Sequence, residues 1–128
     1  MTGGLVLIVE DNEQNLKLDR DVLQFNGFRT LEARCAGDAL ELALRCAPDV
    51  ILMDIELPDM DGVSALSRLR AEPRTSSTPV IAVTAFGMRT DREQLLHAGF
   101  DDYILKPIDI RSFPDRVRRV RRSMGEHG

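Results

Sequence analysis

The chain has 128 residues, of which 43% are apolar and 30% are charged, and its formal net charge is −4. These values are ordinary for a globular protein, and the length is that of one domain able to bury a sizeable core. The negative charge gives no reason to expect nucleic acid or an anionic membrane as a partner, and no apolar run approaches the roughly 20 residues of a membrane span.

The N-terminus and the cysteines bear on the cellular compartment. Residues 1–4 carry no basic side chain and run into only a short apolar segment, so we expect no signal peptide and a cytoplasmic protein. Cys35 and Cys46 form no C-x-x-C pair, and two reduced thiols are the expectation. His97 and His127 are isolated from both thiols, which removes the usual zinc signatures.

Short apolar runs alternate with segments of helical spacing along the chain. The runs are typical of strands and cover residues 5–9, 50–53, 80–83 and 103–105, and residues 28–31 are expected to form a further short strand. Apolar residues at helical spacing mark four of the intervening segments: Leu18, Val22 and Phe25; Ala39, Leu40, Ala43, Leu44 and Ala47; Val63, Leu66 and Leu69; and Ile110, Phe113, Val117 and Val120.

Cap and breaker residues predict where the helices begin and end. Asn26-Gly27 ends the first helix, and Pro48 closes the second. Residues 90–93 have the form of a capping box for a fourth helix that ends at Gly99. Pro114 has no backbone N–H to donate, so it fits a helix only in the first turn. We therefore favour a late or kinked start of the last helix, after Ser112 rather than Asp109.

The alternation predicts an α/β domain with a doubly wound, five-stranded parallel sheet and helices on both faces. We expect a single domain over residues 1–128, with a core from about residue 5 to about residue 122 and a short polar C-terminal tail.

Four polar residues stand at or just past the ends of the apolar runs, namely Asp11, Asp54, Thr84 and Lys106. In a parallel sheet threaded by helices, ligands bind at the carboxyl ends of the strands. Two acids, a hydroxyl and an ammonium would therefore converge there, a set that suits a divalent cation beside a phosphoryl group. Crowded carboxylates repel one another unless a cation offsets them, which favours a functional interpretation over four unrelated surface residues.

These residues resemble the receiver domains of bacterial response regulators. The similarity extends from residue 5 to residue 120 and is carried by residues 9–12, 53–62, 83–85 and 106–107. The segments 7–17 and 51–58 are most similar to stand-alone receivers of cell division and cell polarity. The resemblance implies the flavodoxin-like strand order 2-1-3-4-5, whose switch point lies between the strands that lead into Asp11 and Asp54.

The resemblance also implies chemistry for the acids. Asp54 would accept a phosphoryl group from a histidine kinase or a histidine phosphotransfer protein. Mg²⁺, or in its place Mn²⁺, would be held by Glu10, Asp11, Asp54 and the backbone carbonyl of Glu56. Glu56 and Phe86 occupy the positions that tune the access of hydrolytic water in the family.

The remaining implied roles concern the switch. Lys106 and Thr84 would each contact a phosphoryl oxygen, and Tyr103 matches the aromatic residue that many receivers rotate inward. The fourth helix, fifth strand and fifth helix would repack and bind a downstream protein. For the Lys106–Pro107 peptide bond, sequence statistics favour trans, whereas the resemblance implies cis.

An arginine-rich segment near the C-terminus invites a nucleic-acid interpretation. No recognition motif or aromatic platform accompanies it, so a solvated helix face or an acidic protein partner is the better expectation, with no nucleic acid or membrane as a partner. Its members are Arg111, Arg116, Arg118, Arg119, Arg121 and Arg122.

Three other functions remain open alongside the receiver. A magnesium-dependent phosphatase with an aspartyl nucleophile wants a second Asp two residues after the first, where this chain has Glu56. A flavin carrier wants a first loop rich in Ser, Thr and Gly to bind phosphate, whereas residues 10–13 are mostly acidic. A degenerate receiver would bind partners without phosphorylation, against which the complete site argues.

Overall fold

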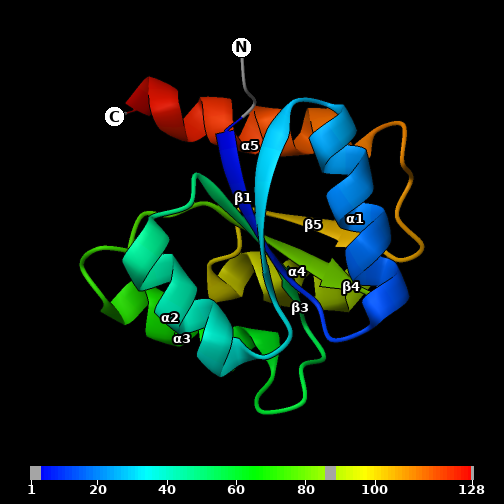
Figure 1. Cartoon of the computed structure of the whole chain (residues 1–128). Coiled ribbons are helices and arrows are strands. Elements are labelled where there is room, and N and C mark those ends of the chain that lie inside the picture. Colours follow the sequence, from blue (N-terminus) through cyan, green and yellow to red (C-terminus); the bar gives the residue numbers. More distant parts are fainter. Residues whose placement is uncertain (1–3, 86–88, 128) are drawn as a thin grey trace.

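A computed structural model describes residues 4–85 and 89–127, with side-chain surroundings for residues 4–85 and 93–121. Strands and helices alternate without exception over these residues (Figure 1). In chain order they are β1 (Gly4–Val9), α1 (Glu13–Phe25), β2 (Phe28–Ala33), α2 (Ala36–Cys46), β3 (Val50–Asp54), α3 (Gly62–Ala71), β4 (Val80–Thr84), α4 (Arg89–Ala98), β5 (Asp102–Leu105) and α5 (Phe113–His127).

The strands form one parallel sheet in the order β2-β1-β3-β4-β5, which confirms the expected topology. Every residue of β3 and β4 is buried because helices cover both faces of the sheet. Residues of α1 and α5 pack on one face, and those of α2, α3 and α4 pack on the other (Figure 1). The carboxyl ends of β1 and β3 lie side by side at the switch point, with Val9 paired to Met53.

The helix ends match most of the cap predictions. The side chain of Asn12 accepts a hydrogen bond from the Asn15 amide and caps α1, and Asn26 follows its last turn. α4 begins at Arg89, one residue before the expected cap at Thr90, whose side chain lies outside the described residues. α5 begins at Phe113, so Pro114 falls in its first turn, and the prediction of a late start is confirmed.

Only part of the apolar stripe that marks α1 in the sequence faces the core, where Val22 is partly buried. Phe25 is 92% exposed and Leu18 45% exposed, whereas the buried residues of the helix are Leu16, Asp19 and Leu23. Val63 in α3 and Ile110 before α5 are also exposed, unlike the other members of their stripes. The difference in α1 has a physical cause: apolar side chains lie on two sides of this helix, and an acid, Asp19, occupies the middle of the buried side.

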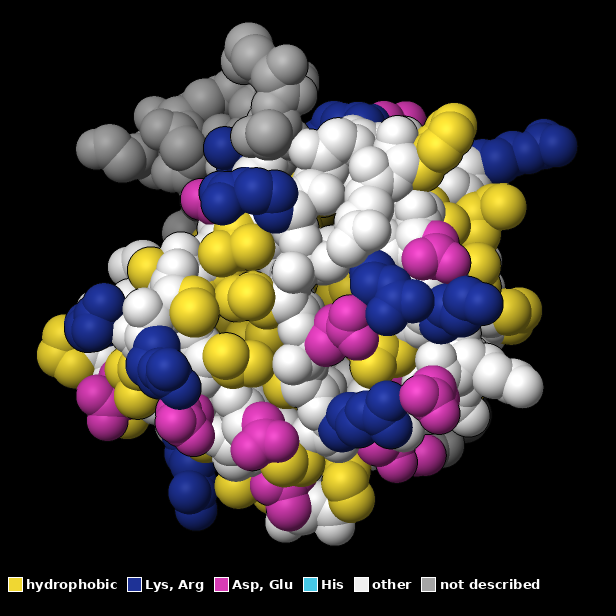
Figure 2. Space-filling model, in the orientation of Figure 1, with side chains coloured by type: hydrophobic (Ala, Val, Ile, Leu, Met, Phe, Trp, Pro, Cys, Tyr) yellow, Lys and Arg dark blue, Asp and Glu magenta, His cyan; other side chains and the backbone are white. Residues whose placement is uncertain are grey.

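The surface carries charges of both signs. Lys and Arg side chains lie among Asp and Glu side chains across the face shown in Figure 2. Two of the C-terminal arginines are engaged within the fold: Arg116 pairs with Asp102, and Arg118 pairs with Asp115 and donates to the Asn26 carbonyl. None of the helices in the described part of the chain is long and apolar enough to cross a bilayer.

Candidate functional site

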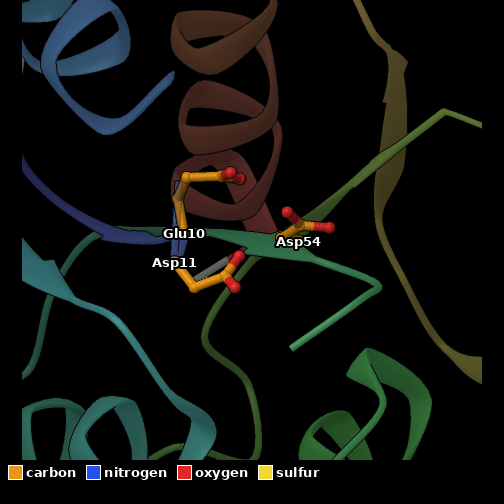
Figure 3. A group of neighbouring side chains, drawn as sticks. All are labelled: Glu10, Asp11 and Asp54. Atoms are coloured by element: carbon orange, nitrogen blue, oxygen red, sulfur yellow. The ribbon is translucent and has the colours of Figure 1, made fainter. Parts of the chain in front are cut away.

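Three carboxylates meet at the carboxyl ends of β1 and β3. Glu10 and Asp11 follow β1, and Asp54 is the last residue of β3. One carboxylate oxygen of each lies within 4.8 Å of those of the other two, and Figure 3 shows Glu10 and Asp11 extending toward Asp54. The predicted meeting of Asp11 and Asp54 is therefore correct, and Glu10 belongs to the same cluster.

Lys106 reaches this cluster from the end of β5. Its ammonium donates to Asp54 Oδ2 at 2.7 Å and pairs with Glu10 Oε2 at 3.3 Å. Burial by itself would lower the pKa of Lys106, but the hydrogen bond and charge of Asp54 and the charge of Glu10 outweigh it and raise the pKa. The ammonium thus stays charged and partly offsets the acids.

Glu10 is the more buried of the two acids after β1, with 3% of its surface exposed. Burial, followed by the proximity of Asp54, raises the pKa of the Glu10 carboxyl well above its ordinary range. The Asn15 side chain and the Asn12 amide both donate to Glu10 Oε1. These hydrogen bonds from the start of α1 orient the carboxyl group toward the cluster.

Thr84 and Glu56 border the same site. Thr84 is the last residue of β4 and is buried, and its carbonyl accepts a hydrogen bond from the Lys106 amide at 2.8 Å. The Glu56 amide donates to Asp54 Oδ1 at 2.9 Å, so both Asp54 oxygens are hydrogen-bonded and the carboxyl group has a defined orientation. Phe86, the second residue predicted to tune water access, lies outside the described residues.

The loop between β3 and α3 is anchored at two helix N-termini. Asp59 accepts hydrogen bonds from the Ala36 and Gly37 amides of α2, whose own N-cap residue, Cys35, provides no side-chain hydrogen bond. Asp61 caps α3 through Ser64. The hydrogen bonds from these amides lower the pKa of each carboxyl group, so both caps are negatively charged near neutral pH.

Close packing at Gly62 positions this loop further. A β-carbon added at Gly62 would lie 2.9 Å from the Ile55 Cα and 3.0 Å from the Asp54 carbonyl oxygen. A larger residue would therefore push α3 away from the backbone of Asp54.

Tyr103 lies on β5 among partly buried residues of the core. The guanidinium of Arg116 sits 5.7 Å from the centre of its ring, donates to its carbonyl and pairs with Asp102. These contacts hold Arg116 over the expected switch residue, a relation that sequence patterns did not predict. The Lys106–Pro107 peptide bond is cis, as the resemblance implied.

Sequence reasoning also missed Asp19. This acid faces inward from α1 with 4% of its surface exposed, close enough to Lys106 and Asp54 to interact with their charges. Its position between Leu16 and Leu23, three residues after one and four before the other, was the available signal.

The acidic cluster fits a magnesium ion. Carboxylate oxygens are the ligands that Mg²⁺ prefers, usually one or two together with water and phosphate oxygens. Two of the three acids are buried, and their mutual repulsion is unfavourable unless a cation compensates it. The donor set and its electrostatics therefore suit a divalent cation.

Comparison with known proteins agrees with this geometry. The Polar-differentiation response regulator DivK of Brucella ovis is 42% identical over 113 residues, covering 88% of this chain and 92% of that protein. The receiver domain of sensor histidine kinase PA1611 from Pseudomonas aeruginosa PAO1, solved with a magnesium ion in its active site cleft, superposes with a TM-score of 0.85 at 35% identity, over 94% of this chain and 98% of the other. A putative response regulator from Chloroflexus aurantiacus J-10-fl superposes with a TM-score of 0.88 at 28% identity, over 93% of this chain and 98% of the other.

The match to the family itself is nearly as long as the chain. Residues 6–118 match the response regulator receiver domain, a stretch that contains all five strands from Val6 onward together with Glu10, Asp11, Asp54 and Lys106. With the acidic cluster and the sheet order described above, this match identifies the chain as a member of the response regulator receiver domain family.

Proposed function

We propose that this protein accepts a phosphoryl group on Asp54 from a histidine kinase or a histidine phosphotransfer protein, and thereby acts as a switch in a two-component system or phosphorelay. Receiver domains are the phosphorylation-dependent switches of such systems. One observation carries the assignment to Asp54: its buried carboxyl group lies 2.7 Å from the Lys106 ammonium, inside the acidic cluster. A carboxylate placed in this way is a competent nucleophile for phosphoryl transfer.

In the proposed reaction, an Asp54 oxygen forms a bond to phosphorus while the phosphorus–nitrogen bond of the donor histidine breaks. The electron pair of the broken bond remains with the imidazole nitrogen. Lys106 and the Thr84 hydroxyl would each donate a hydrogen bond to a phosphoryl oxygen, which stabilises charge that develops during transfer. The same groups would assist the slow hydrolysis of the acyl phosphate.

The metal has a place in this proposal. Glu10, Asp11, Asp54 and the carbonyl of Glu56 would hold Mg²⁺, with Mn²⁺ as a possible substitute. When bound, the ion supplies positive charge to the phosphoryl oxygens and to the carboxylates around them.

The proposed output is an altered contact with another protein. Thr84 and Tyr103 occupy the switch positions on β4 and β5. The ring of Tyr103 contacts the guanidinium of Arg116, a residue of α5. Repacking of α4, β5 and α5 would present a changed surface to a downstream protein target. We propose proteins rather than nucleic acid or membrane as the partners.

Two free cysteines agree with a reducing compartment, the cytoplasm.

The magnesium-dependent phosphatase is the less favoured function. Such an enzyme needs an acid two residues after the nucleophile that can protonate the leaving group. Glu56 occupies that position with an exposed side chain, and the described contact with Asp54 comes from its backbone amide. Turnover of a phosphate ester by the purified protein would reverse this preference.

The test is covalent labelling with acetyl phosphate and Mg²⁺, read by intact-protein mass spectrometry. The wild-type protein should gain one phosphoryl group, and Asp54→Asn should gain none. Asp38→Asn is the matched control, because Asp38 is an exposed aspartate on α2 and its variant should label like wild type. Equal labelling of Asp54→Asn would place the acceptor elsewhere.

A further inference from the structure

Asp19 is a buried acid at the centre of the core-facing side of α1. Only 4% of its surface is exposed, and the core residues Leu16 and Leu23 lie on the same side of the helix. Moving a carboxylate out of water is unfavourable unless hydrogen bonds or opposite charges replace the lost hydration. The surroundings of this residue therefore need an explanation.

The protein supplies Asp19 with little compensation. No hydrogen bond or salt bridge joins its carboxyl group to another residue in the described part of the chain. The charge of Lys106 favours the ionised carboxyl, while that of Asp54 opposes it. Lys106 itself is already committed, because its ammonium contacts both Asp54 and Glu10.

The Asp19 oxygens nevertheless reach open space. Within the described residues, every fully enclosed side-chain oxygen or nitrogen has a hydrogen-bond partner, so an unpartnered carboxyl group must border an accessible volume. That volume is a pocket of about 290 Å³ between α1 and the segment after β5. Its lining residues are Asn15, Leu18, Asp19, Lys106, Pro107 and Ile108.

The chemistry of this pocket selects a cation with an apolar stem. Leu18, Pro107 and Ile108 provide apolar contacts. The Asn15 side-chain NH₂ donates to Glu10, and the Lys106 ammonium is held by Asp54 and Glu10, which leaves the Asp19 carboxylate as the charged group available to an occupant. Lysine and arginine side chains combine a positively charged end with a long apolar stem, and they match this arrangement.

The pocket adjoins the phosphorylation site through a shared residue. Lys106 lines the pocket and also contacts Asp54, so a protein that brings a phosphorylated histidine to Asp54 covers the surface around it. The same protein would meet the apolar side chains that α1 leaves exposed, Leu18 at the pocket edge and Phe25 further along the helix.

We propose, resting on the function proposed above, that the Asp19 pocket receives a lysine or arginine side chain of the protein that delivers the phosphoryl group to Asp54. The ion pair would form only in the complex. A delivering protein with a neutral or acidic residue at this point would leave the Asp19 carboxylate buried without a partner, so the pocket selects among phosphodonors.

A direct test uses small mimics of the two side chains. ¹⁵N-labelled protein is titrated with butylguanidinium and butylammonium at constant ionic strength and about pH 8, where Asp19 is mostly ionised, with 1-butanol as the uncharged control. The cations should cause saturable amide shifts at Asn15, Leu18 and Ile108. Asp19→Asn should abolish the shifts, whereas Asp21→Asn, an exposed acid on the same helix, should keep them. Absence of saturable shifts, or identical shifts with butanol, would overturn the pocket as a cation site.

A second arm assigns the cation to the phosphodonor. Labelling by acetyl phosphate is compared with labelling by a purified, phosphorylated histidine kinase fragment that is active on the wild-type chain. Asp19→Asn should keep the acetyl phosphate rate and lose about tenfold or more in the kinase reaction, the loss that accompanies one charge-assisted hydrogen bond. Unchanged transfer from the kinase, or an equal loss with both donors, would contradict the proposal. Wild-type protein that no donor labels at Asp54 would instead refute the proposed function.

Discussion

The buried Asp19 predicts how the stability of this protein depends on pH. Burial, with a contribution from the charge of Asp54 and against that of Lys106, raises the pKa of the Asp19 carboxyl from 3.8 to about 7. Between these two values the folded protein binds more protons than the unfolded chain. The free energy of unfolding therefore falls as the pH rises through this window, and it levels off above about pH 7.

The size of the effect follows from the difference between the two pKa values. The folded and unfolded pKa values differ by about 3 pH units, and one pH unit corresponds to about 1.4 kcal/mol. Full ionisation of the carboxyl group therefore lowers the free energy of unfolding by about 4 kcal/mol. Over the practical range from about pH 5.5 to about pH 8, roughly 2 kcal/mol of this loss is observable. Asp19→Asn keeps the shape of the side chain and removes its titration, so it removes this loss.

Urea unfolding without metal measures the prediction. The Asn variant should be more stable than wild type, and its advantage should grow by roughly 2 kcal/mol between about pH 5.5 and about pH 8. Glu10, whose pKa is also raised, titrates in both proteins and cancels in the comparison. Asp21→Asn should follow the wild-type curve, because Asp21 is exposed. A constant difference across this range would refute the reasoning from burial.

Two further predictions concern the metal and the core. Mg²⁺ at ~100 times its dissociation constant should add ~2.7 kcal/mol to the free energy of unfolding, and Asp11→Ala should remove most of this gain. Thermal unfolding with and without Mg²⁺ measures the gain. A gain of the same size in the variant would place the ion elsewhere. Leu66→Ala should cost about 2–5 kcal/mol because Leu66 is fully buried under the sheet. Leu18→Ala, at 45% exposure, should change stability by less than about 1 kcal/mol; similar losses in urea unfolding would contradict the assigned helix orientations.

The fold and the acidic cluster followed from local patterns. Continuous apolar runs predicted four of the five strands, because parallel strands inside the sheet are covered on both faces and show no alternation. The edge strand β2 carries Arg29 and Thr30 and was expected as a short strand without such a run. The polar residues after these runs then had to meet at one edge of the sheet. The strand order came from the family resemblance, since alternation alone permits several doubly wound orders.

The remaining features depend on contacts that local patterns do not contain. In α1 the apolar spacing marked Leu18, Val22 and Phe25 and passed over Asp19, because a count of apolar periodicity does not include an acid. Asp59 caps α2 from a loop, through residues 23 and 22 positions before it in the chain, and Arg116 covers Tyr103 from the following helix. Only the packed structure brings such pairs together.

The stability cost and the proposed selectivity of Asp19 have the same origin. A carboxylate that water cannot reach freely is unfavourable in the isolated protein, and a cation that enters the pocket relieves that penalty on binding. The gain is available only to a partner that carries the cation, whereas a partner that closes the pocket without one completes the desolvation of the acid. An apolar residue at position 19 would stabilise the domain yet treat both partners alike. In the proposed complex, the burial penalty that makes Asp19 unfavourable for folding is the same penalty that would favour a phosphodonor carrying the cation.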